Sequence, residues 1–129
     1  MATILQNHHV LAVHDLAESA RFFVDQLGFA VSAEPDGWTF VTRDDCMIMI
    51  GHCPDDLPPN ALGCHSYFSY LLVDDAAGYH ADVVAKGGNP SPLVDRPWGL
   101  REFGVKTPEG HRLTIGEWIG VSARRPPSR

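Results

Sequence analysis

The sequence is poor in the features that mark membrane-spanning, disulfide-rich and nucleic-acid-binding proteins. It contains no apolar run long enough to cross a bilayer, and we expect no signal peptide. Its three cysteines are an odd number without the spacing of a disulfide framework, which predicts reduced thiols and a cytoplasmic location. Ten basic residues against sixteen acidic ones give a net charge of −6, which disfavours binding to phosphate backbones. We therefore expect neither a membrane nor a nucleic acid as partner.

What the chain does contain is a repeat of predicted elements. Its 129 residues and 44% hydrophobic content suit one domain with a substantial core. A strand, a helix and three strands follow one another twice, and such repetition indicates the fold more firmly than any local pattern. Corresponding positions lie about sixty residues apart in the first part of each repeat and slightly further apart in the second part. The pairs in the first part are Val13 and Val73, Asp15 and Asp75, and Gly28 and Gly88; those in the second part are Trp38 and Phe103, and Ile50 and Ile115.

The repeat predicts an α+β fold in which two βαβββ modules form curved mixed sheets around a cleft. Within one domain over residues 1–119, we place module one at about 4–51, a linker at 52–64 and module two at about 65–119. The linker is rich in proline and aspartate. Residues 120–129 are polar, basic and proline-containing, which predicts a flexible tail.

Local signals support the individual elements. The apolar run at 4–13 predicts the first strand, and Asp15 followed by Glu18 has the pattern of a capping box at the start of a helix. In the second module, residues 89–99 contain three prolines, which predicts a loop or an irregular edge strand.

The hairpin over residues 96–117 is the most distinctive stretch. Pro97 and Gly99 punctuate a turn that can expose Trp98, and the residues that follow alternate in polarity as in a strand. A second turn contains Pro108 and Gly110, which favour tight turns. The sequence thus gathers an indole, a guanidinium and two carboxylates around one hairpin, which suggests either a ligand wall or an ordinary half-exposed hairpin.

Aromatic side chains are the best candidates for ligand contact, because aromatic faces stack on planar groups and attract cations. Nearby acids would suit a positively charged part of a ligand, and an arginine could contact ligand or pair with a neighbouring acid. For strand aromatics such as Trp38 and Phe68, core packing is a strong alternative. The candidate ligand-binding residues are Trp38, Phe40, Tyr67, Phe68, Trp98, Arg101, Glu102 and Asp56.

The repeat resembles the vicinal oxygen chelate superfamily, which includes glyoxalase I, extradiol dioxygenases, fosfomycin-resistance enzymes and bleomycin-binding resistance proteins. The residues that carry the resemblance are His-His-Val-Leu-Ala-Val-His-Asp-Leu in one half and Thr-Pro-Glu-Gly-His-Arg-Leu in the other. The runs Arg43-Asp44-Asp45 and Pro97-Trp98-Gly99, with Arg101-Glu102-Phe103, are most similar to the bleomycin resistance branch. That branch implies a homodimer with an exchanged N-terminal strand and two ligand clefts at the interface, where residues 47–50 would form part of a buried seam.

Metal-using members of this superfamily place ligands on the first and last strands of each half. By the repeat, these four positions are His8, Phe68, Met49 and Thr114. Only His8 is a suitable ligand, because phenylalanine cannot coordinate and methionine and threonine are poor ligands for hard or borderline cations. We therefore expect no cofactor, and no catalytic residue is assigned. If a metal were bound, the fallback ligands would be His8, His65 and Glu117.

Three functions remain open at this point. The first is a non-catalytic protein that sequesters a planar or cationic small molecule, such as a bleomycin-type antibiotic, and so confers resistance. The second is a metal-dependent lyase, isomerase or dioxygenase with atypical ligands. The third is a binding protein for an unrelated metabolite or a domain that has lost its ligand. The missing ligand set favours the first and third over the second.

Overall fold

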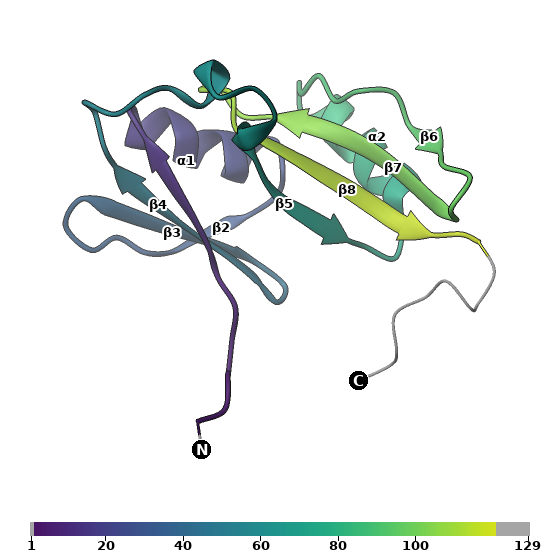
Figure 1. Cartoon of the computed structure of the whole chain (residues 1–129), viewed down its shortest axis with the longest axis horizontal. Coiled ribbons are helices and arrows are strands. Elements are labelled where there is room, and N and C mark those ends of the chain that lie inside the picture. Colours follow the sequence, from purple (N-terminus) through teal and green to yellow (C-terminus); the bar gives the residue numbers. More distant parts are fainter. Residues whose placement is uncertain (1, 121–129) are drawn as a thin grey trace.

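A computed structural model describes residues 2–120 and shows two βαβββ modules, as the repeat predicts (Figure 1). The tail predicted at 120–129 lies outside the described residues, apart from Gly120. Module one forms a four-stranded sheet in the order β1-β4-β3-β2. Its elements are β1 (His9–Val13), α1 (Leu16–Asp25), β2 (Ala30–Ala33), β3 (Trp38–Arg43) and β4 (Cys46–His52).

Module two repeats this arrangement in a second sheet with the order β5-β8-β7-β6. Two short 3-10 helices in the connection, η1 (Pro59–Ala61) and η2 (Gly63–Ser66), lead into it. Its elements are β5 (Tyr67–Leu72), α2 (Ala76–Ala85), β6 (Val94–Asp95), β7 (Leu100–Lys106) and β8 (Arg112–Trp118). The predicted α+β class is confirmed. The proline-rich stretch at 89–99 yields only the two-residue edge strand β6, because proline cannot donate to a ladder.

Each sheet has one face covered by its helix and one face left open. In module one, alternate strand residues such as Val41, Ile48 and Ile50 are buried with Phe22 and Phe23 of α1. In module two, the core lies where alternate residues of β7 and β8 meet α2: Phe103, Val105, Leu113, Ile115, Tyr79 and Val83. The residues between them in sequence face away from the helices and line the open faces.

This alternation corrects the expected seam at residues 47–50. Ile48 and Ile50 are fully buried in the core of their own module, whereas Met47 and Met49 are half-buried. A strand cannot present four successive side chains to one surface, because neighbours point to opposite faces. Only Met47 and Met49 remain for any contact on the open face.

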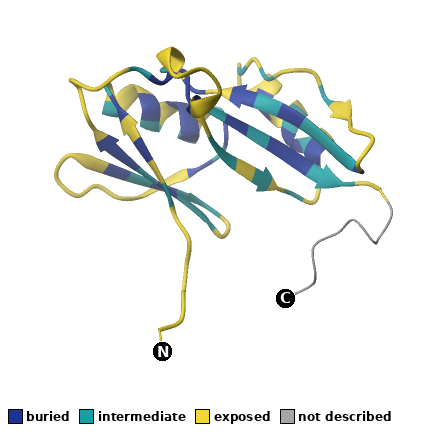
Figure 2. Ribbon diagram, viewed as in Figure 1, coloured by how far each residue is buried: buried dark blue, intermediate teal, exposed yellow. Residues whose placement is uncertain are grey.

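The first strand is shorter than the apolar run at 4–13 predicts. It begins at His9, whose parallel partner is Ile48 in β4. Residues 2–8 form no strand, and Figure 2 shows them as an exposed arm that leaves the body of the protein. The side chains of Ile4 and Leu5 are 90% and 87% exposed. A strand needs a neighbouring strand to pair with, and β4 begins at Cys46, which the register places level with residue 7, so residues 2–6 extend past its start.

The start of α1 is capped from the other module. Asp15 accepts from the backbone N–H of Glu18, as expected, but the Glu18 side chain does not complete a capping box. Instead, Glu109 in the β7–β8 turn accepts from the backbone N–H groups of His14, at 2.7 and 2.9 Å, and Asp15, at 2.7 Å. A carboxylate from module two therefore satisfies the N-terminal end of the helix in module one.

His111 is buried at the junction between the modules. Its ring meets the Phe68 ring edge-on at 6.0 Å between centroids, and its backbone N–H donates to the Thr107 hydroxyl at 3.0 Å. Burial lowers the pKa of His111, although the nearby Glu109 carboxylate and a hydrogen bond to the Ala12 backbone act in the opposite direction. The histidine is therefore kept neutral in the folded protein.

We expect this buried histidine to make the protein sensitive to acid. Because the folded-state pKa lies below the unfolded value of about 6.5, the unfolded chain takes up the proton first and stability falls as the pH drops below that value. Relative to His111→Gln, the free energy of unfolding of the natural chain should decline by up to about 1.4 kcal/mol per pH unit in this window. Urea unfolding of both proteins at pH 7.5, 6 and 5 measures this, and a constant difference would contradict it.

Candidate ligand-binding faces

The open face of the first sheet carries two aromatic side chains on β3. Trp38 and Phe40 lie two residues apart and meet edge-on with 6.2 Å between ring centroids. Trp38 is paired with Gly51 in β4, and its ring lies over that glycine. A Cβ added at Gly51 would come within 2.9 Å of the indole ring, so the absence of a side chain there lets the ring rest on the sheet.

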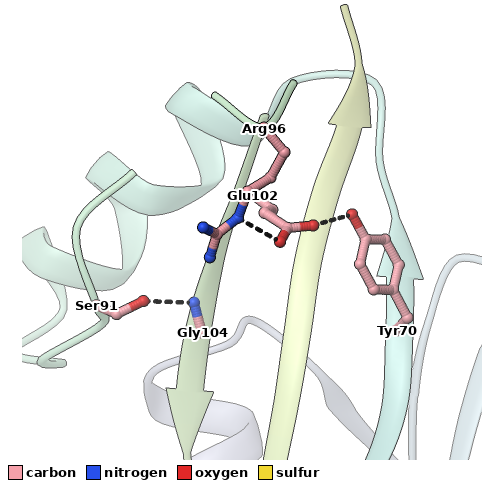
Figure 3. Close-up of polar contacts among 5 residues, drawn as sticks. All are labelled: Tyr70, Ser91, Arg96, Glu102 and Gly104. Carbon is pink, nitrogen blue, oxygen red and sulfur yellow. Dashed lines mark hydrogen bonds and ion pairs between the residues drawn. The ribbon is translucent and has the colours of Figure 1, made fainter. Parts of the chain in front are cut away.

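The open face of the second sheet is built in a similar way. Tyr70 on β5 reaches across β8, and its hydroxyl donates a 2.8 Å hydrogen bond to Glu102 on β7 (Figure 3). Gly116 of β8 lies beneath the tyrosine, and a Cβ there would overlap the Tyr70 hydroxyl. The glycine is therefore what allows the ring to span three strands.

The turn before β7 adds an arginine and an indole to this face. The Gly99 N–H donates to the Arg96 carbonyl at 3.0 Å, which closes the turn around Pro97 and Trp98 as the sequence predicts. The Arg96 side chain folds back and donates from Nε to Glu102 at 3.0 Å (Figure 3). Its guanidinium carbon lies 5.9 Å from the centroid of the Trp98 ring, which is 49% exposed.

Burial and the contact with Glu102 both act on the protonation of Tyr70. Desolvation, followed by the hydrogen bond to the Glu102 carboxylate and its negative charge, raises the pKa of the Tyr70 phenol. The phenol therefore remains a donor even at a pH near 10, where an ordinary tyrosine ionises, and each carboxylate oxygen of Glu102 accepts one hydrogen bond within this group of residues. We call Tyr70, Arg96, Trp98, Glu102 and Gly116 the Tyr70 array.

The remaining candidate residues have other surroundings. Tyr67 lies beneath the Arg112 guanidinium, 4.7 Å from its ring centroid, and Phe68 packs against the core. Arg101 points away from the Tyr70 array, since it alternates with Glu102, and forms an ion pair with Asp95 at 2.7 Å. Asp56 lies in the linker, where its side chain accepts from the Leu57 N–H. Of the candidate residues, the structure thus places Trp38 in contact with Phe40. It also connects Trp98 to Glu102 through Arg96, which lies beside the indole and donates to the carboxylate.

The four metal positions of the superfamily do not fit a metal in this chain. Met49 pairs with Val10, Thr114 pairs with Tyr70, and neither pair offers a strong ligand for a hard cation. Across residues 2–120, no group of three or more His, Cys, Asp or Glu side chains is placed to hold an ion. His8 and His65 are exposed, and Glu117 accepts from the Ala76 N–H at the start of α2, 2.9 Å away.

A cavity of about 730 Å³ opens between the modules and borders the Tyr70 array. Its lining includes Tyr70 and Leu72 of β5, Tyr79 of α2, and the β3–β4 turn. The Tyr79 hydroxyl donates to the Leu27 carbonyl at 2.6 Å, and Arg43 lies 4.4 Å above the Tyr79 ring. The Tyr79 ring in this cavity is thus held by contacts within the protein, whereas Trp38 and Tyr70 keep exposed ring surface on the open sheet faces. No helix within residues 2–120 is long and apolar enough to cross a membrane.

Sequence reasoning missed Arg96 and the two supporting glycines as members of a site, and it noted Tyr70 beside Tyr67 and Phe68 without including it among the candidate ligand-binding residues. The glycines carry a signal, because Gly51 and Gly116 follow the corresponding residues Ile50 and Ile115 in the repeat. A glycine at the same place in the last strand of both modules points to a ring lying above the strand.

Comparison with known proteins assigns the chain to a family. Among solved structures, an antibiotic-binding protein from Streptomyces sp. CB03234 aligns with a TM-score of 0.75 and 22% identity over 92% of this chain and 98% of that chain. The bleomycin-binding protein of Streptomyces verticillus, complexed with copper(II)-bleomycin, gives 0.70 and 22% over 94% and 100%. A bleomycin resistance determinant encoded on transposon Tn5 gives 0.74 and 23% over 87% and 96%.

At these identities the structural likenesses establish the fold. No curated protein sequence matches the chain. The family model, in contrast, matches residues 5–115, nearly the whole of both modules. The chain therefore belongs to the glyoxalase/bleomycin resistance protein/dioxygenase superfamily.

Proposed function

We propose that the protein binds a small molecule with a planar aromatic part, such as a bleomycin-type antibiotic, and sequesters it without changing it chemically. The observation that carries this proposal is the pair of open sheet faces, on each of which an aromatic ring lies over a glycine and remains accessible. Such rings offer flat surface for stacking at little entropic cost, because they are already held. The antibiotic-binding proteins of similar fold support the ligand class.

We propose binding without catalysis because, among residues 2–120, no group of three or more His, Cys, Asp or Glu side chains could hold a metal ion. In the Tyr70 array the Tyr70 hydroxyl and the Arg96 Nε group both donate to Glu102, and the superfamily's metal positions carry Phe68, Met49 and Thr114. Sequestration needs only affinity, and it would confer resistance by lowering the free concentration of the antibiotic. We also propose a cytoplasmic location, where free Cys46, Cys53 and Cys64 would stay reduced.

Binding and recovery of the ligand test this function. Protein stripped with EDTA is titrated with metal-free bleomycin while tryptophan fluorescence is recorded, and the ligand is then released and weighed by mass spectrometry. We expect saturable quenching that is unchanged by EDTA, and a ligand of unaltered mass. Binding that appears only after a divalent metal is added, or a modified ligand, would instead support the metal-dependent enzyme.

We further propose a homodimer held in part by the N-terminal arm, residues 2–8. Ile4 and Leu5 are almost fully exposed and Val10 is 61% exposed, which leaves apolar surface for a second copy. Burying one such side chain contributes about 2 kcal/mol, so the double substitution Ile4→Asp/Leu5→Asp should weaken dimerisation by at least about a hundredfold. Light scattering after size exclusion measures this. Ala2→Asp/Gln6→Asp adds the same charge as a control, and equal behaviour of both variants would contradict the arm's role.

A further inference from the structure

We propose that Arg96 selects ligands with a hydrogen-bond acceptor, a carbonyl or carboxylate oxygen, at the edge of a planar aromatic body. The inference rests on the proposed function, since it assigns the ligand chemistry of the second open face. It also replaces the expectation, based on Glu102 as an acid, that this face receives the positively charged part of a ligand.

Glu102 is mostly covered from a cationic ligand. Its side chain is only 13% exposed, and its two carboxylate oxygens accept from Tyr70 and from Arg96. The Arg96–Glu102 pair carries no net charge, and the guanidinium is its outer member, with 45% of the side chain exposed. A ligand that reaches this place therefore meets hydrogen-bond donors before it meets the acid.

Arg96 is held in place before any ligand arrives. Its backbone N–H donates to the Leu100 carbonyl at 2.7 Å, its carbonyl accepts from Gly99, and its Nε donates to Glu102. Within residues 2–120, its two terminal Nη groups have no hydrogen-bond partner. A guanidinium that is anchored through Nε keeps a planar fork of donors, and little conformational freedom is lost when they bind an acceptor.

The neighbouring indole completes the recognition surface. Trp98 lies beside the guanidinium and is half exposed, so stacking surface and donors stand next to each other. A planar ring can cover Trp98 while an oxygen on its edge accepts from Arg96. A ligand with an ammonium at the same edge would place a donor against donors, and it would lose affinity.

Three matched probes test the inference: anthracene carboxamide, anthracene carboxylate and aminomethylanthracene, all substituted at the same ring position. Binding is followed by tryptophan fluorescence for the natural chain, Arg96→Met and the control Arg101→Met. Arg101 is close in sequence but is paired with Asp95 on the opposite face of β7. We expect the two acceptor probes to bind the natural chain and Arg101→Met about tenfold more tightly than the ammonium probe, a ratio typical of one charge-assisted hydrogen bond. In Arg96→Met this preference should disappear or reverse, because the donors are lost and the Glu102 oxygen that accepted from Arg96 becomes free to accept from the ammonium probe.

Glu102→Gln provides a second variant should Arg96→Met fail to fold. It removes the negative charge beneath Arg96, and we expect it to bind the carboxylate probe more tightly relative to the ammonium probe. Equal affinities of all three probes for the natural chain, or a preference that is unchanged in the folded Arg96→Met or Glu102→Gln protein, would overturn the role of Arg96 while leaving aromatic binding intact. Failure of bleomycin and of all probes to bind would overturn the proposed function, and this inference with it.

Discussion

Replacing Glu109 by alanine is expected to lower the free energy of unfolding by about 3 kcal/mol, because its carboxylate accepts short backbone hydrogen bonds at the start of α1. Hydrogen bonds to a charged group are each worth about 1.5–3 kcal/mol, and the helix dipole adds to them. The bonds also join the two modules, since Glu109 belongs to module two and α1 to module one. Denaturant unfolding followed by circular dichroism measures the loss.

Glu18→Ala is the matched control for this prediction. Glu18 also places a carboxylate in the first turn of α1, but its side chain makes no hydrogen bond within residues 2–120. We expect that substitution to cost about 0.5 kcal/mol or less, the usual size of an exposed helix-dipole effect. Equal losses for Glu109→Ala and Glu18→Ala would show that the inter-module cap contributes nothing beyond its charge.

Gly116→Val is expected to abolish the Tyr70–Glu102 hydrogen bond and to weaken ligand binding on the second sheet by at least about tenfold. Even a single Cβ at this position would overlap the Tyr70 hydroxyl, so the ring must lift from the sheet. The displaced phenol loses its partner, and Glu102 keeps only Arg96. The lifted ring no longer offers its flat surface to a ligand, and stacking on an aromatic side chain is worth about 0.5–1.5 kcal/mol beyond the area it buries, against 1.4 kcal/mol for a tenfold change in affinity.

The alkaline titration of the phenol reports this displacement independently of any ligand. Because its pKa is raised, Tyr70 should stay protonated at a pH at which an ordinary tyrosine ionises, near 10, and Gly116→Val should restore ordinary phenolate absorbance. Gly104→Ala is the control, since the added Cβ would lie 3.4 Å from Ser91 Oγ and far enough for ordinary contact. Phenolate absorbance that is the same in all three proteins would contradict the role of Gly116.

Much of the fold could be predicted from the sequence because its signals are local and occur twice. Asp15 and Asp75 both cap helices, and both hairpin turns use the residues expected of them. The predictions that failed concern contacts between residues that lie far apart in the sequence. Nothing within 4–13 shows that β4 begins only at Cys46, and nothing around Asp15 shows that its N–H is satisfied by Glu109, 94 residues away.

The candidate site was predictable only where a single strand or turn exposes a ring. Strand alternation places Trp38 and Phe40 on one face, and the Pro97–Gly99 turn exposes Trp98. The Tyr70 array was not predictable in this way, because it depends on strand order: β8 must lie between β5 and β7, with a glycine under the tyrosine. The same order explains why Glu102 is covered by Tyr70 and Arg96 although the sequence suggests a free acid.

The aromatic faces are the centre of this account, and isothermal titration calorimetry of the natural chain and of Trp38→Ala/Trp98→Ala with metal-free bleomycin tests them most directly. Stacking on an aromatic side chain contributes about 0.5–1.5 kcal/mol beyond the area it buries, and the buried ring area adds to this for each of the two indoles. We therefore predict saturable binding by the natural chain and a loss of at least about a hundredfold in the double variant, with its unfolding transition retained. Unchanged affinity in a folded double variant would contradict the account.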